Sequence, residues 1–398
     1  MKNPWSGLKN IPHNIWMLSA TTLINRAGTM VLPFIALYSV EVMKVSIAES
    51  GMVIASFGIG ALISAPFAGK LSDKIGSLRL MEVSLFSSGI FLFFYSIVSD
   101  FTTFLILSFF WAVISESFRP ASMSFISNEI SSERRKTAFA LNRLAINLGM
   151  SIGPVAGGIL STINFSLLFY IDGGTSIAAG LFLVFSRMKA HHKENPEKET
   201  TPETDLIPSV SVLNNKIFLY FLFALIPVDI VFFQHIGALP LFVVDNLGFT
   251  KSVFGIVMGI NTVMVILIEV PLNDAMRNWK NWKSLSLGSV LAGIGFGILV
   301  FTTELYLLIL SVIVWTLGEM ILFPSASNYV AEISPPEKRG EYMGYFQMTF
   351  STSLILGPLL GTKVLEDFGS VILWSGTFAF GIISALMMVK LRGQKKIA

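Results

Sequence analysis

Residues 118–135 read FRPASMSFISNEISSERR, and residues 322–339 read LFPSASNYVAEISPPEKR. The second stretch repeats the first at an offset of 204 residues, and the same offset holds far outside both stretches. Trp111 then matches Trp315. Three residues of a glycine- and proline-rich segment, Gly153, Pro154 and Gly157, match Gly357, Pro358 and Gly361. The repeat predicts that the chain is built from two related halves.

The composition indicates that both halves lie in a membrane. Hydrophobic residues make up 53% of the 398 and charged residues only 13%, whereas a soluble domain carries roughly 25% charged residues. The chain has no cysteine, which excludes disulfides and thiolate metal sites. The net charge of +3 is too small to indicate a nucleic-acid partner. Long apolar runs favour helices, because barrel strands would appear as short alternating segments.

Windows of about 20 apolar residues, the length that crosses the hydrocarbon core, predict twelve spans. Basic residues concentrate in the connections that this count places on the cytoplasmic side, as the positive-inside rule requires. The predicted limits are 14–40, 49–69, 80–98, 101–127, 137–161, 165–187, 216–244, 252–273, 284–303, 305–330, 340–364 and 369–390.

The polar stretch between the sixth and seventh spans is rich in Pro, Glu, Lys and Thr and cannot build a core. It divides the chain into an N-terminal six-helix bundle (1–187), a cytoplasmic linker (188–215) and a C-terminal six-helix bundle (216–398). A repeat of six spans is typical of secondary transporters. We expect a monomer in a bacterial or archaeal cytoplasmic membrane with both termini in the cytoplasm.

Two motifs resemble those of the major facilitator superfamily. GKLSDKIGSLRL (69–80) is similar to the loop between its second and third helices, although Ser77 and Leu78 replace a basic pair. GMSIGPVAGG (149–158) fits the fifth-helix pattern that this superfamily associates with antiporters. The layout most resembles the twelve-helix drug:proton antiporter branch. The resemblance implies an all-α fold of two six-helix bundles that exports small molecules as protons enter.

The fifth-helix motif contains Gly149, Gly153, Pro154, Gly157 and Gly158. Three of the glycines are four residues apart, share one helix face and let another helix approach closely. The proline removes a backbone donor and bends the helix. The resemblance implies that this face packs against the eighth helix and seals the outer end of the path. Generic close packing around a kink is the alternative.

The loop motif predicts a cytoplasmic gate. Gly69 and Gly76 allow helix ends to approach, and Asp73 could pair with Arg134 or Arg135. Glu129, at the end of the fourth span, could join them. Such contacts would latch the inner side while the outer side is open. Ordinary solvation of the loop is the alternative.

Charged residues inside spans are candidates for function, because each costs several kcal/mol unless it is paired or hydrated. Asp229, Glu116 and Glu319 are, in that order, the candidate proton sites. Arg26 and Arg119 would be counter-charges or would bind an anionic substrate group, and a fixed Glu116–Arg119 ion pair is the alternative. The resemblance implies that the first, fourth, seventh and tenth spans, which carry these five residues, line one cavity.

Further polar residues within spans are weaker candidates. Asn25 and Gln234 are candidate substrate contacts. Glu269 could belong to a gate, and Arg143 could reach the interface or line an inner vestibule. Asp172 is expected to be peripheral.

Three functions compete. The first is a proton-coupled exporter of amphipathic or lipophilic small molecules. The second is a proton-linked symporter or facilitator of a polar, possibly anionic metabolite, which the arginines would bind. The third, a membrane enzyme or receptor, is disfavoured because no nucleotide loop, metal cluster or nucleophile–base pair stands out, and no cofactor is expected. The expected partners are the substrate, protons and the lipid bilayer.

Overall fold

The structure is a computed structural model that describes residues 11–130, 132–186, 188, 212–276, 278–335 and 339–392. All regular elements in those ranges are helical. Eleven helical stretches are long and apolar enough to cross a membrane. The longest, 48 residues, contains Gly369 with φ 82° and ψ 172°, a left-handed break that divides it into two helices. With that division the twelve predicted spans are present.

Eight helices form the first half, because the first and the fourth spans are each divided into two helices. They are α1 (His13–Ala27), α2 (Val31–Glu41), α3 (Ile47–Ile75), α4 (Ser77–Tyr95), α5 (Phe101–Ser115), α6 (Phe118–Glu129), α7 (Ser132–Ile163) and α8 (Ser166–Phe185).

The second half repeats this plan, with the seventh span broken into four short elements. It contains η2 (Val212–Asn214), α9 (Lys216–Phe232), η3 (Phe233–His235), α10 (Ala238–Leu241), η4 (Phe242–Asn246), α11 (Lys251–Ala275), α12 (Asn281–Ile298), η5 (Leu299–Phe301), α13 (Leu305–Ile333) and α14 (Arg339–Val389).

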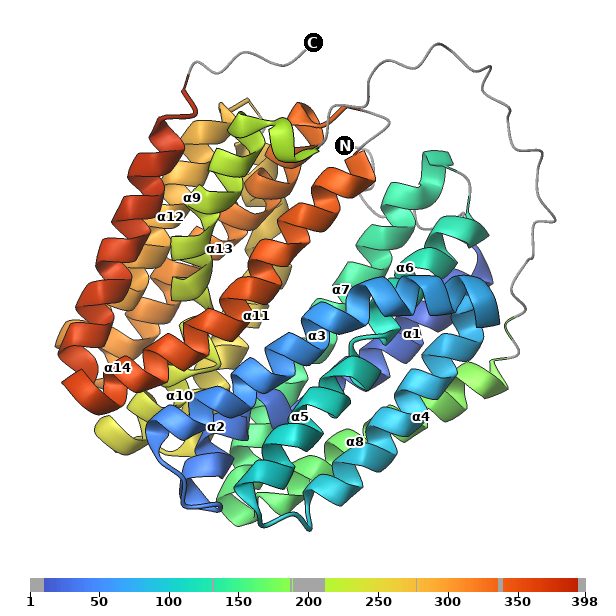
Figure 1. The fold of residues 1–398 in the computed structure, drawn as a ribbon, viewed down its shortest axis with the longest axis horizontal. Helices are drawn as coiled ribbons and strands as arrows, with labels where there is room; N and C mark the ends of the chain where they lie inside the picture. The colour runs from blue at the N-terminus through green and yellow to red at the C-terminus, as the bar shows by residue number, and fades with distance from the viewer. Residues whose placement is uncertain are drawn as a thin grey trace.

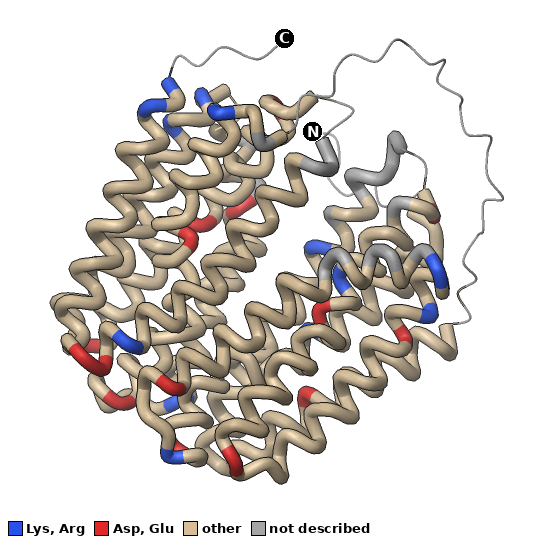
Figure 2. The backbone as a smooth tube through the Cα atoms, in the orientation of Figure 1, with Lys and Arg blue, Asp and Glu red and all other residues tan. Residues whose placement is uncertain are grey.

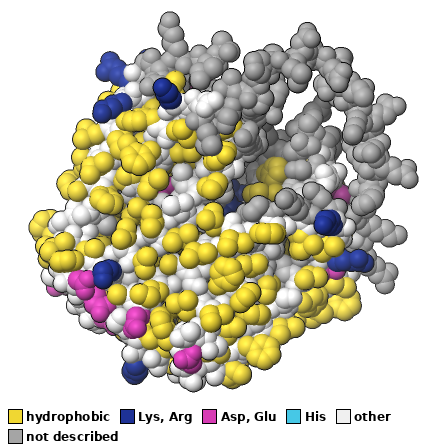
Figure 3. Space-filling model, viewed as in Figure 1, with side chains coloured by type: hydrophobic (Ala, Val, Ile, Leu, Met, Phe, Trp, Pro, Cys, Tyr) yellow, Lys and Arg dark blue, Asp and Glu magenta, His cyan; other side chains and the backbone are white. Residues whose placement is uncertain are grey.

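The helices form two bundles, α1–α8 and α9–α14, that converge at one end and separate at the other (Figure 1). α2 and α10 meet at the converging end, which we call the closed end. α9 begins and α14 finishes at the opposite, divergent end. Hydrophobic side chains cover much of the face of both bundles shown in Figure 3, as expected for a surface in contact with lipid.

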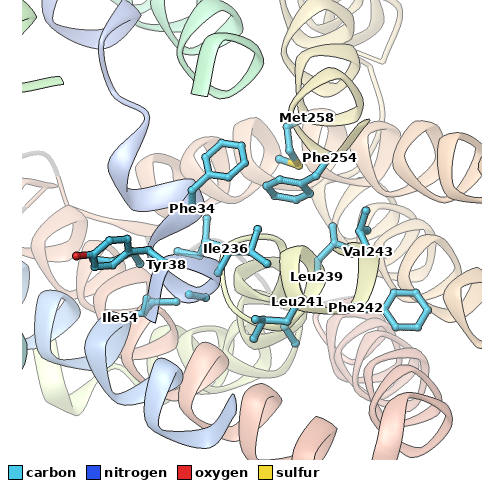
Figure 4. Packing of buried hydrophobic residues seen from close by; sticks show 14 of the residues in the cluster. Phe34, Tyr38, Ile54, Ile236, Leu239, Leu241, Phe242, Val243, Phe254 and Met258 are labelled. Carbon is cyan, nitrogen blue, oxygen red and sulfur yellow. The ribbon is translucent and has the colours of Figure 1, made fainter. Parts of the chain in front are cut away.

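The closed end is filled by apolar side chains from both bundles (Figure 4). The rings of Phe34 and Phe254 meet edge to face with centroids 5.4 Å apart. Lys251 Nζ lies 2.6 Å from a carboxylate oxygen of Glu41, which joins α11 to the end of α2. Dry packing and an ion pair therefore hold the bundles together here. The cluster includes Phe34, Tyr38, Ile54, Ile236, Leu239, Leu241, Phe242, Val243, Phe254 and Met258.

The break between α1 and α2 is fixed by α8. A side chain at Gly28 would overlap Thr175, because an added Cβ would lie 1.6 Å from its Oγ1. The backbone amides of Met30 and Val31 both donate to Asp172 Oδ2 at 3.1 Å. Asp172 is 4% exposed and satisfies two of the amides left free where α2 begins. The expectation that Asp172 is peripheral is wrong.

Candidate functional site

Two seams join the bundles, α7 with α11 and α3 with α14. At the first seam, a Cβ added to Gly255 would lie 2.4 Å from the Pro154 carbonyl oxygen. At the second, a Cβ added to Gly51 would lie 2.9 Å from the Pro358 carbonyl oxygen. These two contacts are related by the offset of 204 residues. The repeat therefore makes two similar close contacts between the two bundles.

The antiporter-motif glycines divide between two neighbours. Added Cβ atoms at Gly149, Gly153 and Gly157 would meet Arg26 Cβ at 2.5 Å, the Thr29 carbonyl oxygen at 2.4 Å and Met30 Cβ at 2.9 Å. The predicted contact of this face with the eighth helix is wrong, because the face packs on α1 and the start of α2 in the same bundle. Residues Pro154 and Gly158, on another face of α7, approach Gly255 of the eighth helix instead.

Spacing shows which residues share a face but not which helix that face meets. Each residue turns a helix by about 100°, so Gly157 and Gly158 face different neighbours. Glycine allows close backbone approach on both sides. The motif consequently lets adjacent residues of α7 contact two helices closely, α2 in its own bundle and α11 in the other bundle.

A pocket with both polar and apolar walls lies inside the first bundle, with about 490 Å³ of space not filled by atoms, part of it open to solvent. It brings together two of the predicted charged residues, Arg26 and Glu116. Arg26 Nε is buried and has no hydrogen-bond partner. Asn25 Nδ2 donates to Ser176 Oγ at 3.1 Å. The remaining lining residues are Thr29, Leu32, Phe57, Ser84, Leu85, Ser88, Trp111, Ser115, Phe118 and Asp172.

Arg119 lies apart from this pocket. It is exposed on α6 and is not among the lining residues. Glu116 lies just after α5, on the other side of the short break before α6. No ion pair joins Glu116 to Arg119. The fixed pair considered as an alternative is therefore absent from this conformation.

Asp229 lies in α9 and is completely buried. Neither carboxylate oxygen has a hydrogen-bond partner among the residues that the structure describes. Thr349 of α14 is a polar side chain beside Asp229. Its hydroxyl donates to the Phe346 carbonyl oxygen at 2.8 Å instead. Asp229 does not line the pocket that contains Arg26. The predicted acids are consequently distributed over both bundles and do not share that chamber.

Glu319 has a hydrogen-bond partner on α11, Asn261, that the sequence did not reveal. Asn261 Nδ2 donates to Glu319 Oε2 at 2.8 Å and to Thr316 Oγ1 at 3.0 Å. Asn261 is neutral and lies within an apolar run, so no charge pattern indicated it. The charged groups within electrostatic reach of Glu319 are Glu269 and Arg143, rather than Arg26 or Arg119.

Arg143 of α7 forms an ion pair with Glu269 of α11. This pair crosses the seam between the bundles. The side chain of Arg143 is 57% exposed and that of Glu269 is 13% exposed. The seam therefore carries a charged link that continues the glycine contacts toward the divergent end.

Gln234 stabilises the break in the seventh span. Its Nε2 donates to the carbonyl oxygens of Ile230 at 3.0 Å and Gly357 at 2.8 Å. The side chain is 1% exposed. This conformation leaves Gln234 no surface for substrate. It joins α14 to the seventh span much as Asp172 joins α8 to the first.

The predicted gate is described only in part. Gly76 separates α3 from α4 with φ 88°, a left-handed conformation that favours glycine. Glu129 Oε1 accepts a hydrogen bond from Asn14 Nδ2 at 2.6 Å. The environment of Gly69 and the side chains of Asp73, Arg134 and Arg135 lie outside the described residues. Pairing between Asp73 and the two arginines stays a prediction.

Within the described ranges, no group of three or more His, Asp or Glu residues could hold a metal ion. The features that stand out are two related bundles, two glycine seams and buried charged groups beside them. These features define a secondary transporter built from two repeated bodies.

The family model described as "Major Facilitator Superfamily" matches residues 17–302 and 235–395, and the chain belongs to this family. An uncharacterized MFS-type transporter of Bacillus subtilis, YqjV, is 23% identical, with 96% of this chain and 93% of the relative covered. Multidrug resistance protein 1 of Bacillus subtilis is 25% identical, covering 79% of this chain and 80% of the relative.

A Na(+), Li(+), K(+)/H(+) antiporter of Planococcus maritimus is 24% identical, covering 89% of this chain and 90% of the relative. Among solved structures, the nucleoside transporter NupG superposes with a TM-score of 0.79 at 17% identity. That match covers 96% of this chain and all of NupG, and it confirms the major facilitator fold. The chain is a transporter and not an enzyme.

Proposed function

We propose that this transporter is a proton-coupled antiporter that exports amphipathic or lipophilic small molecules by alternating access. The observation that carries the proposal is Asp229, a fully buried carboxyl group with neither oxygen hydrogen-bonded. An ionised carboxylate in this place would cost several kcal/mol. Asp229 therefore carries a proton while the closed end is shut, and releases it in a conformation that admits water or a cation.

Glu319 is proposed as the second proton-binding group. Glu319 accepts a hydrogen bond from the Asn261 amide. A neutral amide can bond to the ionised or the protonated carboxyl group, whereas a fixed ion pair would hold Glu319 ionised. Arg143 lies within electrostatic reach but is paired with Glu269 across the seam. A movement of one bundle against the other changes that pairing. The charge near Glu319 therefore depends on the conformation.

The direction of transport rests on the fifth-helix motif and on relatives named as a multidrug resistance protein and a cation/proton antiporter. Basic residues crowd the divergent end of the second bundle, whereas several acids lie at the closed end (Figure 2). By the positive-inside rule the divergent end is cytoplasmic. The conformation described is then open to the cytoplasm and closed to the outside, and the membrane is a bacterial or archaeal cytoplasmic membrane.

A second candidate function is favoured by the pocket of the first bundle. Among the described residues its Arg26 Nε has no hydrogen-bond partner, and the lining contains Asn25, serine hydroxyls and the carboxyl groups of Glu116 and Asp172. A polar metabolite with an anionic group would satisfy that donor. This site would suit a proton-linked symporter or facilitator rather than an exporter of lipophilic compounds.

Inside-out vesicles with an acidic interior test the first proposal. The chain should drive accumulation of an amphipathic cationic dye, and Asp229→Asn should abolish it. Glu304→Gln, which removes an exposed acid at the start of α13, is the matched control and should accumulate dye normally. Dye accumulation that is unchanged in Asp229→Asn removes Asp229 as the coupling group. Proton-dependent uptake of a small carboxylate, lost in Arg26→Gln, would favour the second candidate.

A further inference from the structure

Four exposed basic side chains lie together at the divergent end of the second bundle. Figures 2 and 3 show basic residues concentrated on this part of the molecule. We call the group the basic cluster, and it consists of Lys280, Lys283, Lys390 and Arg392.

Packing between two helices brings the cluster together. Lys280 and Lys283 lie at the start of α12, and Lys390 and Arg392 follow the end of α14. Ser286 Oγ donates to the Ala385 carbonyl oxygen at 3.1 Å, which ties these two helices together one turn away. The cluster is therefore held by the fold, although its members come from distant parts of the chain.

An indole ring lies at the centre of the cluster. Lys283 Nζ is 5.8 Å and Arg392 Cζ is 5.5 Å from the centroid of the Trp282 ring. A second indole, that of Trp279, is 47% exposed nearby in sequence. Tryptophan prefers the level of lipid head groups, and the cation–π contacts hold two basic groups at that level.

Within the part of the chain that the structure describes, no acidic side chain neutralises the four positive charges. None of them makes an ion pair with a described residue. Among the described residues, the acid Glu332 lies at the same end and accepts a hydrogen bond from Asn281 Nδ2 at 2.7 Å. A surface with this excess of charge attracts an anion.

The internal repeat shows that the fold does not require this arrangement. At positions 204 residues earlier stand Gly76, Arg79, Ser186 and Met188, of which only Arg79 is basic. Trp279 and Trp282 match Ile75 and Leu78. The first bundle therefore lacks the aromatic centre, although basic residues stand in the same sequence segments, namely Lys74, Arg79, Arg187 and Lys189.

We propose that the basic cluster binds the head group of an anionic phospholipid. Its phosphodiester would lie among the four basic groups, its glycerol region against Trp282, and its chains along exposed apolar residues of α14 such as Leu386 and Val389. Charge complementarity at the level of the membrane surface selects a lipid over a soluble anion. The proposal does not depend on the substrate or the direction of transport.

The full chain in nanodiscs tests the site. Phosphatidylglycerol mixed with phosphatidylcholine should raise the melting midpoint above that in phosphatidylcholine alone, and native mass spectrometry should detect retained phosphatidylglycerol. In Lys283→Gln/Arg392→Gln, loss of two surface charges predicts an about thirty-fold weaker association of this lipid. Its melting midpoint in phosphatidylcholine should equal that of the parent chain, which shows that the variant folds.

The matched control is Lys74→Gln/Arg79→Gln, which removes two exposed charges at the corresponding end of the first bundle. It should keep the phosphatidylglycerol effect. Equal loss in both double variants would mean that the lipid responds to overall charge and would overturn the proposal. An undiminished effect in Lys283→Gln/Arg392→Gln would overturn it as well. Trp282→Leu, which installs the residue of the first half, should weaken retention while keeping every charge.

Discussion

Replacing Gly255 by alanine should force the α7–α11 seam apart. The added Cβ would lie 2.4 Å from the Pro154 carbonyl oxygen and 3.2 Å from Gly158 Cα. Both are backbone atoms, so no side chain can rotate to make room. Relief to an ordinary contact requires a shift of about 1 Å between two helices of different bundles. Since the contact belongs to the conformation with a shut closed end, the substitution disfavours that conformation.

The size of the effect follows from the cost of overpacking, about 1–3 kcal/mol in a well-packed interior. Alanine is also a better helix former than glycine by about 1 kcal/mol. That gain is present in both conformations and cancels from their equilibrium. The population ratio of the two conformations should therefore change by roughly 5- to 150-fold in favour of the conformation in which the bundles separate at the closed end.

Spin labels at the closed end measure this ratio. The chain has no cysteine, so spin labels attach only at Val42→Cys and Asn246→Cys, one in each bundle. The distribution of distances between the two labels then reports the opening of the closed end. Gly376→Ala is the control, because a Cβ there meets nothing within 4 Å. The steric reasoning is refuted if the Gly255→Ala distribution matches that of the parent chain, or if Gly376→Ala opens the molecule equally.

Three other changes have defined outcomes. Asp172→Ala removes an acceptor of two amides and should lower stability by about 1.5–3 kcal/mol, measured by thermal melting, whereas Asp172→Asn should lose less. Ser46→Ala breaks the capping box of α3 and should cost about 1 kcal/mol in the same assay. Arg143→Glu or Glu269→Arg alone should shift the label distances, and the double exchange should restore them; no restoration would disprove a direct pair.

Most of the fold could be predicted from the sequence because lipid imposes simple rules. Hydrophobic length, the skew of basic residues and the repeat at 204 residues indicated the spans and the two halves. The breaks within spans could not be predicted. The first span stops at Gly28, since Thr175 leaves no space for a side chain, and α2 restarts on Asp172, which comes from a helix more than 140 residues later.

The sequence offered candidate site residues one by one, but not the contacts that each of them makes. Charge inside a span identified Arg26, Glu116, Asp229 and Glu319 as unusual. Their neighbours depend on helix rotation, which the hydrophobic pattern leaves open when most faces are apolar. Neutral partners such as Asn261 carry no signal in composition. The role of Asp73 in a gate stays a prediction, because its side chain lies outside the described residues.

The repeat separates what the two halves share from what each does alone. Both supply a glycine opposite a proline carbonyl oxygen, so the moving contacts are alike. Their charged groups are not alike. Asp229 and Glu319 stand where the first half has Asn25 and Ser115.

Conversely, Arg26 and Glu116 of the pocket stand where the second half has Ile230 and Met320. Symmetry in glycine and asymmetry in charge have different physical causes. Rocking requires equivalent seams, since both must open and close together. The asymmetry in charge places the acids Asp229 and Glu319 in the second bundle and the pocket with Arg26 and Glu116 in the first. We infer that the second bundle carries the coupling proton.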